Sequence, residues 1–101
     1  MLFQVIHTHS DEDCPTRTAQ QARASVKWWQ AFKKTPGVKV MAGMAATLDH
    51  TFYITVEADD YQTLERALGP LLSIGTARVS PVLTLDHVLS MAETSAHRAA
   101  K

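Results

Sequence analysis

The sequence predicts a single α+β domain whose elements follow the order β-α-β-β-α-β. Two observations carry this prediction. Four runs are rich in residues that favour strands, and helix-forming segments separate the first run from the second and the third from the fourth. With 101 residues, the chain can build one hydrophobic core but not two. Right-handed crossovers then give a four-stranded antiparallel sheet with both helices on one face, a ferredoxin-like arrangement.

The first strand is expected over residues 2–9, a run of high strand propensity that ends at a polar segment and Pro15. Alternate side chains of a strand share a face. One face of this strand therefore carries Phe3, Val5, His7 and His9. The opposite face also holds apolar groups, so both faces are expected to be covered.

The first helix is expected over residues 16–34 or 18–34, because the segment lacks Gly and Pro and a threonine stands at either start. Adjacent helical residues point about 100° apart, so only one of Trp28 and Trp29 can face the sheet squarely. We expect Trp29 in the core with Ala22 and Val26. Trp28 can then line a pocket mouth, pack against a dimer partner or cover the tail.

Two further strands, over residues 38–47 and 51–58, are expected to form a hairpin. The turn between them contains His50, which is expected to be exposed to solvent. Alternation in the second of these strands places Tyr53 on the face opposite to its most apolar side chains. The hydroxyl of Tyr53 is expected to reach either a pocket or an opposing sheet.

The second helix is expected to begin after Asp59 or Asp60, either of which can cap it. Its apolar stripe includes Leu64 and Leu68. Pro70 removes a backbone amide and crowds the preceding turn, so a kink is expected at that point.

The last strand is expected over residues 77–85, and Pro81 within it indicates an edge position or a bulge. The expected domain covers residues 1–88. Residues 89–101 are expected to form a short helix or a disordered tail.

The sheet face without helices predicts a homodimer. Apolar side chains of the first strand, with Met41 and Met44 of the second, give this face an apolar character. Two such faces packed against each other would be hidden from water, and further assembly into a higher oligomer stays open. Because the formal net charge is zero, nucleic acid is not an expected partner.

The chain shows no sign of export or membrane insertion. No apolar run approaches the length that spans a bilayer, and the N-terminus lacks the pattern of a signal peptide. Cys14 is the single cysteine, which excludes an intrachain disulfide and favours a reducing compartment. A cytoplasmic location without membrane contact is expected.

Two segments resemble a known superfamily. The opening MLFQV and the later LLSIGTARVSPV, residues 71–82, look like muconolactone isomerases and small relatives within the dimeric α/β-barrel superfamily. The resemblance covers about residues 1–88. It implies a ferredoxin-like fold and a dimer, in a superfamily that includes isomerases, cofactor-free monooxygenases, haem-degrading enzymes and stress proteins.

Histidines are the residues most able to carry chemistry. His7 is the candidate catalytic residue, because imidazole titrates near neutrality and this one shares a face with apolar side chains. His9, Trp29 and Tyr53 are candidate substrate-binding residues. The alternative is that His7 and His9 are structural groups bonded to the backbone.

Three functions remain open from the sequence. The first is a small-molecule enzyme or binder for an apolar or aromatic ring compound, of isomerase or monooxygenase type and without a required cofactor. The second is a protein that binds a transition metal or haem through His7 and His9, with Cys14 as a further metal ligand. The third is an interaction or stress module with no active site.

Overall fold

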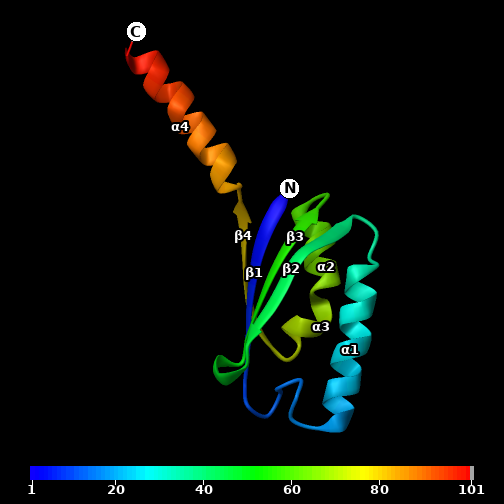
Figure 1. Cartoon of the computed structure of the whole chain (residues 1–101). Coiled ribbons are helices and arrows are strands. Elements are labelled where there is room, and N and C mark those ends of the chain that lie inside the picture. Colours follow the sequence, from blue (N-terminus) through cyan, green and yellow to red (C-terminus); the bar gives the residue numbers. More distant parts are fainter. Residues whose placement is uncertain (101) are drawn as a thin grey trace.

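The computed structural model describes residues 1–100, with side chains described through residue 96, and it confirms the predicted ferredoxin-like α+β fold. One antiparallel sheet has the strand order β2-β3-β1-β4 (Figure 1). The elements are β1 Leu2–His9, α1 Ala19–Lys33, β2 Val38–Ala46, η1 Thr47–Asp49, β3 Thr51–Ala58, α2 Tyr61–Ala67, α3 Gly69–Leu72, β4 Gly75–Val82 and α4 Leu85–Ala100.

The core lies between the sheet and the helices α1, α2 and α3, which cover one of its faces (Figure 1). The alternation predicted for β1 is confirmed. The four side chains expected on one face, Phe3, Val5, His7 and His9, are all buried. The sheet and the helices contribute the remaining large buried apolar groups, which include Ile54, Val56, Phe32, Leu64, Leu68 and Leu71.

Helix α1 begins where the sequence indicates, because the hydroxyl of Thr18 accepts a hydrogen bond from the Gln21 amide at 3.1 Å. Its buried face differs from the expected one. Phe32 is buried, whereas Val26 is 59% exposed. Trp28 stacks on Phe32 with ring centroids 4.9 Å apart, whereas Val26 borders an open cavity, which leaves its side chain accessible to solvent.

The expected kink is a break between two short helices. The side chain of Asp60 caps α2 by accepting a hydrogen bond from the Thr63 amide at 2.7 Å. Helix α2 ends before Leu68, and α3 begins at Gly69 with a proline in its first turn. A proline is tolerated there because the amide it lacks has no partner within a helix.

The last strand is shorter than predicted. Strand β4 ends at Val82, and residue 85, predicted as its last residue, opens helix α4. Thr84 explains this, because its Oγ1 accepts a hydrogen bond from the His87 amide at 3.2 Å in the manner of an N-cap. Pro81 lies on the sheet edge, as predicted.

The expected tail, predicted as a short helix or a disordered chain, falls within helix α4. This helix begins ahead of the expected boundary after residue 88 and extends away from the sheet (Figure 1). The tail prediction also covers Lys101, which lies outside the described residues. None of the helices within residues 1–100 has the length and hydropathy that crossing a membrane requires.

Candidate functional site

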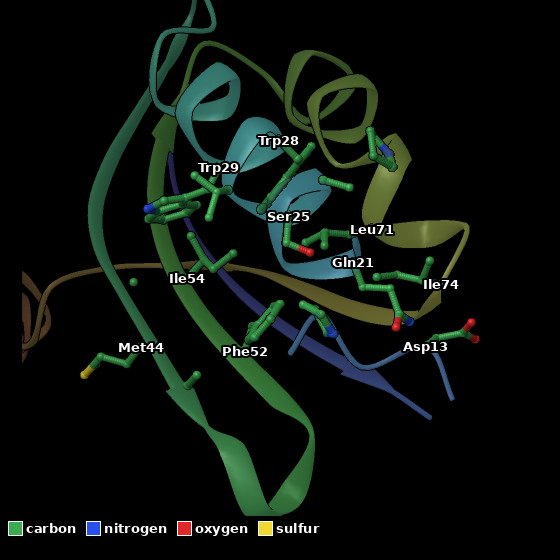
Figure 2. Close-up of a pocket in the computed structure, with 16 residues that line it drawn as sticks. Asp13, Gln21, Ser25, Trp28, Trp29, Met44, Phe52, Ile54, Leu71 and Ile74 are labelled. Atoms are coloured by element: carbon green, nitrogen blue, oxygen red, sulfur yellow. The ribbon is translucent and has the colours of Figure 1, made fainter. Parts of the chain in front are cut away.

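A cavity of about 490 Å³ lies between the sheet and helices α1 and α3 (Figure 2). Its volume falls within the range of small-molecule sites. Most of its wall is apolar or aromatic, and Figure 2 labels Trp28, Trp29, Phe52, Ile54, Leu71 and Ile74 among the wall residues. Met44 borders the cavity, but its side chain points away from it, toward the open face of the sheet. Three polar side chains also line it: Asp13, Gln21 and Ser25.

Trp29 forms a wall of this cavity because β2 carries a glycine where the ring crosses it. A Cβ atom built on Gly43 would lie 2.7 Å from the Cη2 atom of Trp29. Any side chain there would therefore displace the indole. Lys33 places its ammonium 5.5 Å from the centroid of the Trp29 ring, a cation–π distance that helps hold the ring in place.

Trp28 joins α1 to the α2–α3 junction. Its indole N–H donates a hydrogen bond to the Ala67 carbonyl at 3.3 Å. Both tryptophans are half-buried, and both line the cavity. Trp29 is the one that faces the sheet, as expected, because its ring lies over β2, while Trp28 packs against the helices and lines the cavity.

His7 is completely buried behind the cavity wall. Its Nε2 atom lies 2.8 Å from the Leu71 carbonyl oxygen. A carbonyl can only accept, so Nε2 carries the proton and Nδ1 is the unprotonated nitrogen. The ring also stacks on Phe52, with centroids 5.7 Å apart. His7 thus fits the alternative of a structural histidine bonded to the backbone.

Burial lowers the pKa of His7, although the hydrogen bond to the Leu71 carbonyl opposes that shift. The neutral imidazole is therefore favoured. His7 itself does not line the cavity; it supports Phe52 and Leu71, which do.

A second cluster lies at the end of β1, where His9, Cys14 and His50 meet. One potential ligand atom from each lies within 4.8 Å of the others. The His9 amide donates to the His50 carbonyl at 3.1 Å, which ties the end of β1 to the turn before β3. Of the expected ligands His7, His9 and Cys14, only His9 and Cys14 belong to this group, and His50 lies with them in the place of His7.

His50 was expected in solvent, but its side chain is only 32% exposed. The strand pairing explains the difference. Strand β1 runs antiparallel to β3, and Thr8 pairs with Thr51. The residue before β3 must therefore lie beside the residue after Thr8, which is His9. This proximity was implicit in the predicted topology, although the turn position suggested exposure.

The pKa values of the cluster follow its burial and hydrogen bonds. Burial lowers the pKa of His9, and the neighbouring His7 and His50 add to the shift. The side chain and backbone amide of Thr16 lower the pKa of Cys14, with His50 contributing less. The acidic run before Cys14, residues 11–13, would by itself disfavour a thiolate. The hydrogen bonds from Thr16 act in the opposite direction, and the Asp11 carboxylate lies 3.3 Å from the Arg17 guanidinium.

Of the four candidate catalytic and substrate-binding residues, only Trp29 lines the cavity. His9 packs on the rear of Phe52, with ring centroids 5.2 Å apart. Tyr53 projects from the open face of the sheet, opposite to Phe52 and Ile54. It therefore cannot touch a ligand in this cavity from within the same chain. A haem placed in the cavity would likewise find no axial ligand from His7 or His9.

Comparison with known proteins adds little to this geometry. No protein-family model matches the chain, and no curated protein does. A solved structure from Deinococcus radiodurans, whose proposed activity is that of an antibiotic biosynthesis monooxygenase, aligns with 82% of this chain and 92% of its own length. The TM-score is 0.45 and the sequence identity 13%. A likeness at this level supports no statement about activity.

Proposed function

We propose that the protein binds an apolar or aromatic ring compound in the cavity between sheet and helices. The observation that carries this proposal is the cavity of about 490 Å³ with two tryptophans and a phenylalanine in its wall. Flat apolar faces favour ring ligands through area burial and stacking. The volume is sufficient for a compound of several fused rings.

The polar residues of the cavity define how such a ligand would be oriented. Gln21 is already engaged, since its side-chain amide donates to the Glu12 carbonyl at 2.9 Å and its oxygen accepts from Thr18. The Asp13 carboxylate accepts one hydrogen bond, from the Ser10 hydroxyl at 3.2 Å through Oδ2, so its Oδ1 atom and the Ser25 hydroxyl are left to meet a polar substituent. A hydroxyl or carbonyl on the ring compound would pair with the Ser25 hydroxyl, and a hydroxyl or amine would pair with the carboxylate.

The muconolactone isomerase resemblance extends this proposal to the reaction, which would be isomerisation or oxygenation of the ring compound. We assign His7 a positioning role in that chemistry, because it holds Leu71 and packs on Phe52 without lining the cavity. The groups that would face a substrate directly are those of Ser25 and Asp13.

The test uses a substitution that changes only one wall. Gly43→Ala would place a Cβ 2.7 Å from the Trp29 ring and push the indole off the sheet. We expect ring compounds such as 1-naphthol and 1,4-naphthoquinone to quench the tryptophan fluorescence of the wild-type protein. In Gly43→Ala their affinity should fall by about tenfold, which corresponds to about 1.4 kcal/mol.

Gly69→Ala is the matched control, because a Cβ at that position meets no atom within 4 Å. It should bind as tightly as the wild type. A complete absence of saturable quenching across ring compounds of different size would contradict the proposal. So would equal affinities of the two alanine variants.

We also propose that a second copy of the chain covers the open face of the sheet. Strand register aligns Ile6, Tyr53 and Met44 across that face, with Arg78 beside Ile6 at the β4 edge. Met44 is 67% exposed and Tyr53 is 36% exposed. An apolar row of this kind on an exposed sheet favours burial against another surface.

A further inference from the structure

The cluster at the end of β1 has the donor set of a transition-metal site. His9 comes from β1, Cys14 from the following loop, and His50 from the turn before β3. Two imidazoles and one thiolate suit Zn²⁺ and related borderline ions, which bind nitrogen and sulfur together. Three protein ligands also leave a fourth position for water or a substrate, as in catalytic zinc sites.

The distances need only a small contraction. The potential ligand atoms lie within 4.8 Å of one another. In a tetrahedral zinc site, ligand atoms are separated by about 3.3–3.6 Å, as follows from Zn–N and Zn–S bond lengths. Rotation of partly exposed side chains such as Cys14 and His50 can supply this difference.

An independent observation points to a ligand. His9 is only 6% exposed, and neither of its ring nitrogens has a hydrogen-bond partner among the described residues. A neutral imidazole has one donor and one acceptor nitrogen, and leaving both unpaired in a buried ring costs free energy. A metal ion beside the ring would take up the acceptor nitrogen and remove part of that cost.

The surroundings of His50 distinguish its two ring nitrogens as potential metal ligands. Its Nδ1 atom is buried and unpartnered, whereas its Nε2 atom lies 3.7 Å from the Asp11 carboxylate. Metal-bound histidines commonly donate their other N–H to a carboxylate, which orients the ring and raises its basicity. The arrangement therefore indicates Nδ1 as the metal ligand and Asp11 as the group that orients the ring.

We propose that His9, Cys14 and His50 bind one divalent transition-metal ion, with Zn²⁺ the best match to the donor set. The site is separate from the ring-compound cavity, although the two share a border: Asp13 and Pro15 flank Cys14 and line the cavity, and Phe52 packs on His9. The proposal does not depend on the cavity having a ligand.

The test uses the full chain without an affinity tag, stripped with a chelator and kept reduced by a phosphine. Co²⁺ added to this protein should produce a near-ultraviolet thiolate-to-cobalt band and visible bands of tetrahedral cobalt, both saturating at one equivalent. Zn²⁺ should abolish the bands and raise Tm, because it binds the folded state.

Two substitutions remove ligands without disturbing the core. Cys14→Ser keeps the size of the side chain. His50→Asn preserves the left-handed backbone conformation at φ 50°, which asparagine tolerates well. Each should weaken metal binding by more than about 100-fold, and Asp11→Asn should weaken it by about tenfold. His87→Asn, on the exposed helix α4, is the matched control and should bind as the wild type does.

The proposal is overturned if the wild-type protein shows neither a cobalt–thiolate band nor a change in Tm with Zn²⁺. It is also overturned if Cys14→Ser or His50→Asn binds as tightly as the wild type. Retained affinity in His50→Asn would specifically reject the assignment of this turn histidine as a ligand.

Discussion

Gly75 shows how a single residue shapes the environment of His7. Strand β4 passes β1 at this point, and a Cβ built on Gly75 would collide with the Thr8 carbonyl oxygen and lie 2.8 Å from Nε2 of His7. Backbone cannot yield as a flexible side chain can. The glycine is therefore required both for the strand pairing and for the hydrogen bond from His7 to Leu71.

Replacing Gly75 by alanine should destabilise the fold. We expect Gly75→Ala to lower the free energy of unfolding by about 1–3 kcal/mol, the usual cost of overpacking a filled site. Urea denaturation measured with a chelator present would give this value without a contribution from bound metal. Gly69→Ala, where the added Cβ meets no neighbour, serves as the reference, and equal midpoints for the two variants would contradict the account.

At the residue scale, the sequence predicted which side chains share a face but not which of them meet. Alternation along β1 correctly placed His7 and His9 among the buried groups. Alternation could not show that the Leu71 carbonyl would accept a hydrogen bond from Nε2 of His7, because residues 7 and 71 meet only through tertiary packing. The position of Trp29 depends likewise on Gly43, a neighbour in space and not in sequence.

At the scale of the element, the cap of α2 should give the fold an acid dependence. The Thr63 amide donates to Asp60, and this hydrogen bond lowers the pKa of the carboxyl. A folded-state pKa below the unfolded value means that the ionised group stabilises the fold above the usual aspartate pKa of about 3.9. That stability is lost as the pH falls through the folded-state pKa.

The variant Asp60→Asn isolates this effect, because asparagine also caps helices but carries no titrating group. We expect its Tm to fall less on acidification than that of the wild type, with the difference developing below about pH 3.9. Thermal melts followed by circular dichroism across the acid range would measure it. Parallel Tm curves for the two proteins would show that the cap does not contribute.

The elements themselves were largely predictable, because each has a local signal. Thr18 and Asp60 cap α1 and α2 as their residue types indicate, and Pro70 separates α2 from α3. The end of β4 was missed because the apolar alternation continues past Val82. The competing signal was Thr84, whose capping bond begins α4.

At the scale of the whole molecule, the exposed apolar surface extends beyond the sheet. Helix α4 points away from the body of the domain (Figure 1). Leu85 and Leu89, separated by one helical turn, are 70% and 56% exposed. A helix with an exposed apolar stripe gains stability mainly from tertiary packing, so α4 adds to the surface that a second copy can bury.

A homodimer formed through the open sheet face should have twice the chain mass of 11.1 kDa in sedimentation velocity at micromolar concentration.

Introducing lysines at Tyr53 and Met44 would place like charges from both copies in a symmetric contact, which costs several kcal/mol. We expect Tyr53→Lys with Met44→Lys to weaken the dimer by more than about 100-fold. Gln30→Lys adds one positive charge on the exposed side of α1 and should leave the dimer intact. A wild-type protein that sediments as a single chain, or a double-lysine variant that dimerises as well as Gln30→Lys, would contradict this mode of assembly.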